Sequence, residues 1–323
     1  MKNLLRKILS PFIRPETISR YLVVKSSEAV PPRLWSQIAP YIKQQYARFD
    51  NSTFLLGECV ICGHPSSFFT KINSVPRESL LCAVCLTTSR YRSIARGILR
   101  AFKEISGVTA PSLARLSAST LTSPLRIYDT QMPFYYLTCC YPIPDLLTAI
   151  PNVEVHFSRY LPQEEPGKKL SNQVNLTNQN LERLTFPDAF FDIVITSDVM
   201  EHVRIDSLAH SEIRRVLKPG GVYIFTVPHT RAVSETLHRV VIHDPLDSNK
   251  DEFVLEKEFH GDANSPEDAA LCYRVYGTEL DEILTQVGFI VEYTQQDFPE
   301  AGILSTELFY CRVGTTDSPS RIS

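Results

Sequence analysis

No apolar run in this 323-residue chain is long enough to span a bilayer, and neither sign of charge dominates. A membrane-spanning helix needs about 20 consecutive apolar residues, so none is expected here. Lys and Arg number 33 against 36 Asp and Glu, for a formal net charge of −3. A nearly neutral chain creates no strong field toward polyanions, so nucleic acid is a disfavoured partner, although a local basic surface could still bind it.

The N-terminus lacks the pattern of a cleaved secretion signal, because Arg6 and Lys7 interrupt its apolar run and Pro11 follows closely. As a helix, residues 1–12 would separate an apolar face from a basic one. Such a helix either rests on a membrane surface or packs against the protein body, and we favour packing. The eight cysteines do not suggest a disulfide framework, which fits a reducing compartment. We therefore predict a cytoplasmic location.

Four cysteines form two Cys-x-x-Cys pairs, a spacing typical of structural zinc sites. Cys59 and Cys62 make the first pair, and Cys82 and Cys85 make the second. Each pair places two thiolates on a tight turn, so the four sulfurs can surround one tetrahedral ion. A site with four protein ligands is closed to substrate. We predict structural Zn²⁺ in a small ribbon, with two unrelated redox or buried pairs as the alternative.

Composition divides the chain into five segments. We predict a helical segment over 1–50, a zinc ribbon and basic helix over 51–105, a linker over 106–124, a sheet domain over 125–312 and a disordered tail over 313–323. The helix after the second cysteine pair carries Arg90, Arg92, Arg96, Arg100 and Lys103. Such a run either contacts an anionic partner such as RNA or forms a solvated face, and we favour the solvated face.

From residue 125 onward, short apolar runs alternate with helical patterns, which is typical of an α/β fold with a doubly wound, largely parallel sheet. The clearest strands are 125–128, 153–157, 191–196 and 222–227. A late helix followed by two strands predicts an antiparallel strand at the edge of this sheet.

Residues 184–228, LTFPDAFFDIVITSDVMEHVRIDSLAHSEIRRVLKPGGVYIFTVP, closely resemble the middle of class I S-adenosylmethionine-dependent methyltransferases with a type 11-like domain. The chain also resembles a bacterial subfamily with an N-terminal four-cysteine zinc ribbon, which carries an E-F/Y-H-G-D segment like residues 258–262. The resemblance implies a Rossmann-like methyltransferase fold, S-adenosylmethionine as the cofactor, and an insertion over 229–272 that forms a lid.

The resemblance places the cofactor at the carboxyl ends of the strands, where open α/β sheets bind ligands. The matching positions are Asp129, Thr130, Ser158, Tyr160, Asn180, Leu181, Ser197 and Asp198. The chain departs from the family twice, because residues 125–140 contain no glycine and no carboxylate follows the second strand to hold the ribose. Asn180 stands where the family has an Asp that accepts from adenine, and its carbonyl can accept the same bond.

Methyl transfer is an in-line displacement, in which the enzyme mainly aligns the acceptor with the methyl group. An oxygen acceptor of high pKa needs a general base, most often His. Glu201 and His202 follow the fourth strand and are the first candidates, with capping of the next helix or packing beneath the sheet as their alternative role. His260, in the lid insertion, is the third candidate.

These observations predict transfer of a methyl group to an oxygen or nitrogen of a small-molecule or glycan-type acceptor. Two alternatives stay open. One is a non-catalytic scaffold or binding protein of the same fold, favoured if the cofactor residues do not converge. The other is a ribosomal RNA methyltransferase, favoured if the ribbon and the basic helix form one continuous basic face.

Overall fold

The computed structural model describes residues 55–70, 75–116, 121–130, 142–172, 174–260 and 270–315. The predicted helical segment 1–50, including residues 1–12, lies outside these residues, as do residues 131–141 of the glycine-poor first loop. Within the described part of the chain, no helix combines the length and the apolar character needed to cross a membrane.

The chain forms two compact units, each assembled from separated stretches of sequence. The described residues of the first, the ribbon unit, fall within 55–124, 142–153 and 295–308. Those of the second, the sheet unit, fall within 125–130, 154–294 and 309–315. This division differs from the predicted continuous domain over 125–312, because two of its segments pack with the cysteine-bearing residues instead.

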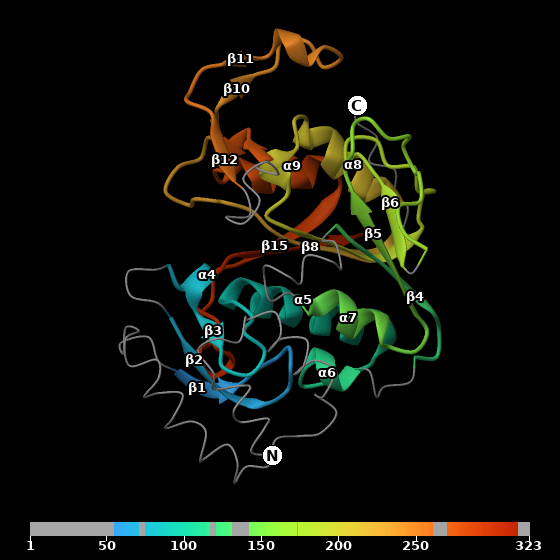
Figure 1. The fold of residues 1–323 in the computed structure, drawn as a ribbon, viewed down its shortest axis with the longest axis vertical. Coiled ribbons are helices and arrows are strands. Elements are labelled where there is room, and N and C mark those ends of the chain that lie inside the picture. Colours follow the sequence, from blue (N-terminus) through green and yellow to red (C-terminus); the bar gives the residue numbers. More distant parts are fainter. Residues whose placement is uncertain are drawn as a thin grey trace. The chain divides into compact units, whose positions relative to one another are not determined.

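The ribbon unit is built on a three-stranded antiparallel sheet (Figure 1). Its strands are β1 (Leu55–Glu58), β2 (Pro65–Phe69) and β3 (Leu81–Cys82). The short helix α4 (Pro76–Ser79) precedes β3, and α5 (Ser89–Ser106) follows it. One face of α5 buries Ile94, Ile98 and Phe102, which have the four-residue spacing of an amphipathic helix.

The segment predicted as a linker, 106–124, contains the helix α6 (Leu113–Leu116) and is anchored to the ribbon unit. Leu113 and Leu116 are fully buried. The backbone N–H of Leu113 donates to the Val60 carbonyl at 2.9 Å, and that of Ala114 donates to Ile61 at 3.0 Å. Sequence analysis missed these anchors, because a few leucines in a Ser- and Ala-rich stretch give no periodic signal. A second short helix of this unit, α7 (Ile143–Thr148), follows later in the chain.

Residues 295–308 contribute a C-terminal piece to the ribbon unit. The 3-10 turn η6 (Pro299–Ala301) contacts β1. Gly302 follows it with φ +66° and faces the Phe68 ring, where an added Cβ would lie 2.3 Å from the ring atoms. Only glycine fits that backbone conformation at that distance. The ion pair of Arg77 Nε with Glu307 Oε1, at 2.9 Å, provides a further contact.

The sheet unit contains a seven-stranded sheet in the order β15-β16-β8-β7-β4-β5-β6. The strands are β4 (Leu125–Asp129), β5 (Val153–Arg159), β6 (Asn175–Asn178), β7 (Phe191–Ser197), β8 (Leu217–Thr226), β15 (Phe289–Thr294) and β16 (Leu308–Val313). The pairs β4–β7, β7–β8 and β5–β6 are parallel, whereas β16 runs antiparallel to β8. The predicted doubly wound sheet with an antiparallel strand at this edge is confirmed, with β15 outside β16.

The helices α8 (Asp206–Val216) and α9 (Glu279–Gln286) contribute to the core of this sheet unit. The rings of Tyr223 and Phe225 stack at 4.4 Å, and those of Phe225 and Phe309 stack at 4.7 Å. This aromatic stack runs across β8 and β16, so the two strands share one packed core.

The segment Lys218-Pro219-Gly220-Gly221 has the proline and glycines that commonly end a helix and turn the chain. The helix does end at Val216, but β8 already begins at Leu217, which pairs with Phe191. The next pair is Ile193 with Val222, so residues 218–221 bulge out of the ladder. Gly220 has φ +77°, and Lys218 Nζ lies 2.8 Å from both carboxylate oxygens of Asp192.

The insertion after β8 folds into short hairpins rather than an extended loop. Its elements are β9 (Leu237–His238), β10 (Val240–Val241), the 3-10 turn η4 (Ser248–Lys250), β11 (Glu252–Phe253), β12 (Glu258–His260), β13 (Ala270–Cys272) and β14 (Arg274–Val275). β9 pairs with β14, β10 with β11 and β12 with β13. Arg204 anchors the segment 244–251 of the insertion. Its guanidinium donates to the Asp251 carboxylate and to the carbonyls of Asp244 and Pro245.

His210 on α8 is a fully buried histidine of the sheet unit. Neither ring nitrogen has a hydrogen-bond partner among the described residues, and the ring lies near Tyr223 and Phe225. Burial disfavours the charged imidazolium and lowers the pKa of His210 to about 4. Because the unfolded chain has the ordinary value of about 6.5, protonation favours unfolding as the pH falls from 6.5 toward 4.

We expect the wild-type protein to lose about 2 kcal/mol of stability between pH 7 and pH 5 through His210 alone. In His210→Phe this loss should disappear, because the residue no longer binds a proton in the unfolded state. Urea unfolding at both pH values measures it. The matched control is His243→Phe, since that side chain is 51% exposed and the loss assigned to His210 should remain in this variant. An equal pH dependence in wild type and His210→Phe would contradict this prediction.

Candidate functional site

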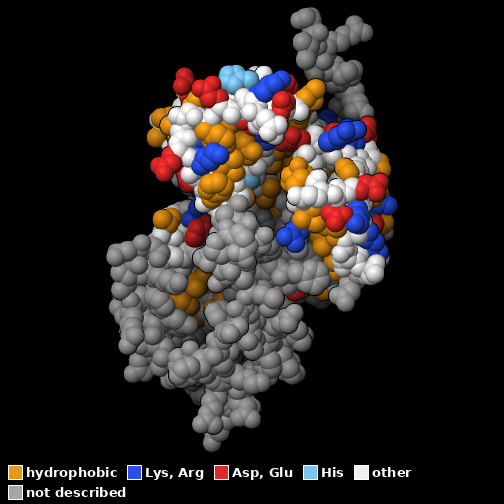
Figure 2. Space-filling model, turned by 45° about the horizontal axis from the view of Figure 1, so that its top comes forward, with side chains coloured by type: hydrophobic (Ala, Val, Ile, Leu, Met, Phe, Trp, Pro, Cys, Tyr) orange, Lys and Arg blue, Asp and Glu red, His pale blue; other side chains and the backbone are white. Residues whose placement is uncertain are grey.

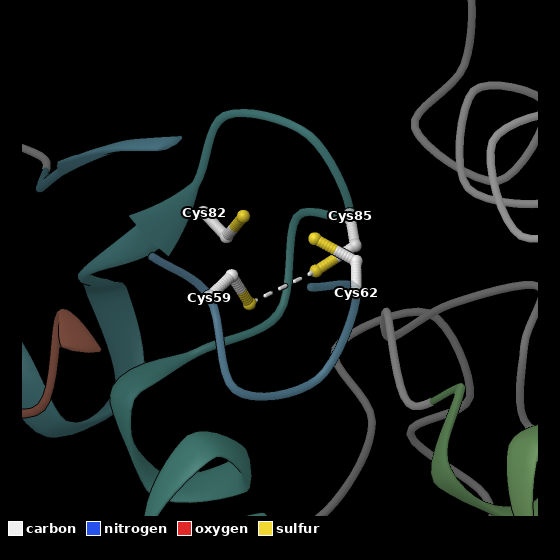
Figure 3. A group of neighbouring side chains, drawn as sticks. All are labelled: Cys59, Cys62, Cys82 and Cys85. Carbon is white, nitrogen blue, oxygen red and sulfur yellow. Dashed lines mark hydrogen bonds between the residues drawn. The ribbon is translucent and has the colours of Figure 1, made fainter. Parts of the chain in front are cut away.

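The four cysteines of the two Cys-x-x-Cys pairs converge at one point of the ribbon unit, as their spacing predicted. Their sulfurs point toward one another in Figure 3 and lie within 4.8 Å of one another. Cys59 Sγ and Cys85 Sγ are 3.8 Å apart. The Val84 N–H and the Ser66 hydroxyl lie 3.4 and 3.0 Å from Cys82 Sγ. Such contacts stabilise thiolates, so the cluster can hold a metal ion with four sulfur ligands.

Arg92 lies beneath this cluster and is fully buried, although the sequence pattern favoured a solvated face for its helix. Its guanidinium donates to the carbonyls of Leu80, Thr87 and Gly302. Burial lowers the pKa of Arg92, while the charge of the surrounding cysteines opposes that shift. Sequence analysis placed Arg92 among the helix cations but missed its burial, because every cation in a run of arginines looks alike.

The first two strand ends carry four of the predicted cofactor contacts. Asp129, at the end of β4, is fully buried, and the Thr130 N–H donates to the Ile195 carbonyl at 3.1 Å. Ser158, near the end of β5, lies 2.6 Å from the Tyr128 hydroxyl. Tyr160 is 60% exposed. The structure thus brings Asp129 and Thr130 next to β7, whereas the Tyr160 side chain points into solvent.

The third strand end holds its own loop through amide side chains. Asn178, which sequence analysis missed, binds the Leu161 N–H and the carbonyls of Leu161 and Glu164. The side-chain oxygen Oδ1 of Asn180 accepts a hydrogen bond from the Glu182 N–H at 2.9 Å, so one of the two lone pairs of Oδ1 is already used. Leu181 packs into the hydrophobic core. An amide at a strand end gives no signal that distinguishes loop support from ligand binding.

The fourth strand end places Ser197 and Asp198 beside β4 and β8. Asp198 has φ +50°, a conformation that is uncommon for residues other than glycine. Its carboxylate accepts from the Thr226 hydroxyl at 2.8 Å. Because β4 and β7 are parallel neighbours, their carboxyl ends lie side by side, and so do Asp129 and Asp198. Two carboxylates there suit a ligand that carries positive charge.

The three predicted catalytic residues form one cluster beyond the end of β7. Glu201 and His202 lie on the 3-10 turn η3 (Met200–His202), and His260 ends β12. One possible ligand atom from each lies within 4.8 Å of the others. Glu201 is fully buried, and burial lowers the pKa of His202. The cluster therefore combines a buried carboxyl group with two imidazoles.

The insertion holds this cluster in place through backbone contacts that the sequence did not reveal. The Tyr273 N–H donates to the Glu201 carbonyl at 2.8 Å, and His202 Nδ1 lies 3.0 Å from the Leu271 carbonyl. Arg274 is buried and donates to the carbonyls of Met200 and Val203. These contacts are not helix caps, whereas the full burial of Glu201 agrees with the alternative that it packs against the sheet.

Comparisons of the sequence with known proteins identify relatives of one class of enzyme. Residues 155–225 match the model of a family described as a methyltransferase domain. A Mycolicibacterium smegmatis protein named a probable S-adenosylmethionine-dependent methyltransferase is 28% identical over 131 residues, or 41% of this chain and 41% of that protein. The chain therefore spans about two fifths of the length of the curated relative that it matches.

Solved structures show weaker likenesses. An S-adenosylmethionine-dependent methyltransferase from Mesorhizobium loti is 16% identical with a TM-score of 0.35, over 62% of this chain and 97% of that one. A Burkholderia thailandensis 1,6-didemethyltoxoflavin N1-methyltransferase is 14% identical with a TM-score of 0.35, over 77% and 96%.

The doubly wound sheet and the matched domain define an enzyme class. The sheet unit has the Rossmann-like α/β fold of methyltransferases, and residues 155–225 within it match a methyltransferase domain. The family match and the curated relative support an S-adenosylmethionine-dependent methyltransferase.

Proposed function

We propose that this protein transfers a methyl group from S-adenosylmethionine to an oxygen or nitrogen of a small-molecule or glycan-type acceptor. The observation that supports it best is the cluster of Glu201, His202 and His260 beyond the end of β7. That strand end also carries Asp198, beside the strand that ends in Asp129. Asp198, Glu201 and His202 therefore follow β7 within five residues, with Asp129 on the neighbouring strand and His260 on β12.

The residues of the sheet unit fit the cofactor at its cationic end. S-adenosylmethionine supplies a methyl group on a positively charged sulfur and carries an ammonium group close by. Asp129 and Asp198 can hold those charges, and Asn180 retains one acceptor lone pair for the adenine amino group. The chain's own residues then align the acceptor and lower the cost of removing its proton, which is the task of the Glu201, His202 and His260 cluster.

We also propose that the four-cysteine cluster holds Zn²⁺ and that the ion is structural, as in the ribbon-bearing subfamily that the sequence resembles. Two Cys-x-x-Cys turns with four converging sulfurs fit tetrahedral Zn²⁺ and leave no open position for substrate. Thiols at this site also argue for a reducing compartment such as the cytoplasm.

The ribosomal RNA alternative required a continuous basic face on the ribbon and α5. The structure gives three of those cations partners within the chain: Arg90 pairs with Glu78, Arg100 pairs with Glu104, and Arg92 is buried. Figure 2 draws a different face, on whose described part acidic and basic side chains are interspersed. An RNA partner needs clustered positive charge, so these observations favour a small acceptor.

Calorimetric titration of S-adenosylmethionine into the full-length, zinc-loaded protein tests the cofactor proposal. We expect micromolar binding to the wild type and about 10- to 100-fold weaker binding to Asp198→Asn, because a charge-assisted contact contributes about 1.5–3 kcal/mol. Asn180→Ala should weaken binding less.

The matched control is Asp188→Asn, because this carboxylate is 79% exposed and lies before β7. It should bind the cofactor like the wild type. No detectable heat with folded wild-type protein would overturn the enzyme proposal and favour the non-catalytic scaffold.

A further inference from the structure

Glu201, His202 and His260 bring two imidazoles and one carboxylate to a single point, from a turn after β7 and from the insertion hairpin. We propose that this cluster binds a divalent transition-metal cation, separate from the four-cysteine site. We propose further that the cation binds the reacting oxygen or nitrogen of the acceptor, a second step that rests on the proposed methyltransferase function.

The spacing of the donor atoms supports an ion between them. His202 Nε2 lies 3.6 Å from Glu201 Oε1, which is longer than the 2.7–3.2 Å of an N–H···O hydrogen bond. Two ligands of a tetrahedral ion, each about 2.1 Å from the metal, are separated by about 3.4 Å. The observed separation therefore fits two ligands of one ion better than a direct hydrogen bond.

The hydrogen bond on the other nitrogen of His202 points the same way. Nδ1 lies 3.0 Å from the Leu271 carbonyl, and a carbonyl can only accept, so Nδ1 carries a proton. In the neutral imidazole, Nε2 then presents its lone pair toward Glu201. When the Glu201 carboxylate is ionised, it and this lone pair are both acceptors, and a cation between them can bind both. A metal-binding histidine whose second nitrogen donates to a backbone carbonyl has this arrangement.

His260 is likewise oriented by a hydrogen bond, in this case to a carboxylate. Its Nε2 lies 2.9 Å from Glu258 Oε1, and the Glu258 carboxylate also pairs with Arg239. When Nε2 donates to Glu258, Nδ1 is the nitrogen that carries a lone pair for a metal. The His260 and His202 rings are perpendicular, with centroids 5.1 Å apart. Both histidines are thus oriented by an acceptor on the side away from their metal-binding nitrogen.

The ligand set selects the kind of ion. Imidazole nitrogens favour Zn²⁺, Fe²⁺, Co²⁺ and related ions, whereas Mg²⁺ and Ca²⁺ prefer oxygen ligands. Three protein ligands leave at least one position open, unlike the closed four-cysteine site. That open position can take an acceptor hydroxyl.

Coordination would make the hydroxyl easier to deprotonate at neutral pH. The O–H bond of the acceptor breaks and its proton passes to water. The oxygen electron pair forms the new bond to the methyl carbon. The electron pair of the broken carbon–sulfur bond stays on sulfur, so the products are the methylated acceptor, S-adenosylhomocysteine and one proton.

The test is calorimetric titration of Zn²⁺ into the full-length chain whose four-cysteine site is already loaded, with the bound metal counted by mass spectrometry. We expect the wild type to take up a second equivalent. His260→Ala and His202→Ala should each weaken that second site by about 100-fold or more, and Glu258→Gln by about 10-fold or more. All of these variants should keep the first equivalent.

The matched control is His243→Ala, because His243 also pairs with a carboxylate of the insertion, Glu252, at 2.9 Å. It should retain the second site unchanged. A wild type that binds one equivalent only, or a second equivalent that His260→Ala retains in full, would overturn the metal proposal. His260 lies on a partly exposed hairpin, so its replacement should not prevent folding.

This experiment uses neither cofactor nor acceptor, so its outcome is independent of the cofactor titration. Cofactor binding without a second metal would leave a methyltransferase that uses its imidazoles as bases. A second equivalent of metal without cofactor binding would support the ion site and overturn the methyltransferase proposal.

Discussion

Replacing Cys82 with serine is expected to abolish tight binding of the structural zinc ion and to unfold the ribbon unit. The sheet that carries the cysteines has strands of four, five and two residues, and so short a sheet needs a staple to be stable. Binding of structural Zn²⁺ contributes on the order of 10–16 kcal/mol to folding in small zinc domains. The loss of one thiolate removes most of that contribution.

The measurement combines zinc content with hydrogen exchange over residues 55–116. In Cys82→Ser, exchange there should approach that of an unfolded chain, and one equivalent of zinc should be lost. Cys311→Ala is the matched control, because Cys311 is a buried cysteine of the sheet unit. It should cost about 1 kcal/mol and keep the zinc. Normal zinc content and protection in Cys82→Ser would show that the four cysteines hold no structural ion.

The second large effect is expected from Arg92→Met, which should destabilise the ribbon unit by about 3–5 kcal/mol. The guanidinium is fully buried and holds three carbonyls from separate parts of the unit: Leu80 before β3, Thr87 before α5, and Gly302 in the C-terminal segment. Methionine fills a similar volume but leaves these acceptors without a donor in a water-free place.

Arg100→Met on the same helix is the matched control. Arg100 pairs with Glu104 one turn away, and both side chains are about one third exposed, so its loss should cost about 0.5 kcal/mol or less. Arg92→Lys should recover little, because one ammonium group cannot reproduce the planar fork of the guanidinium. Chemical unfolding followed by ribbon-unit hydrogen exchange measures all three. Equal stabilities of Arg92→Met and Arg100→Met would contradict the assigned role.

Local patterns in the sequence were sufficient to predict the four-cysteine cluster and most of the sheet. The four cysteines were identified because two thiolates on each tight turn are a short-range signal that needs no knowledge of the rest of the chain. The strands β4, β5 and β7 were predicted within one or two residues, since continuous apolar runs distinguish strands buried on both faces. The resemblance to methyltransferases predicted Asp129, Asp198 and Glu201–His202 as candidates after strand ends, which is where the structure has them.

Only the tertiary structure decided which residues act together over long sequence distances. No local pattern marks Arg92 as different from Arg100, because its burial depends on the C-terminal carbonyl of Gly302 that folds back onto the ribbon unit. The pairing of His202 with His260 likewise depends on the β12–β13 hairpin, whose Leu271 carbonyl orients the first imidazole. The sequence by itself determined the fold class, the cysteine site and the candidate residues. Hydrogen bonds between distant segments decided how the candidate side chains are protonated, how they are oriented and which residues they contact. These properties depend on tertiary contacts that sequence spacing does not encode.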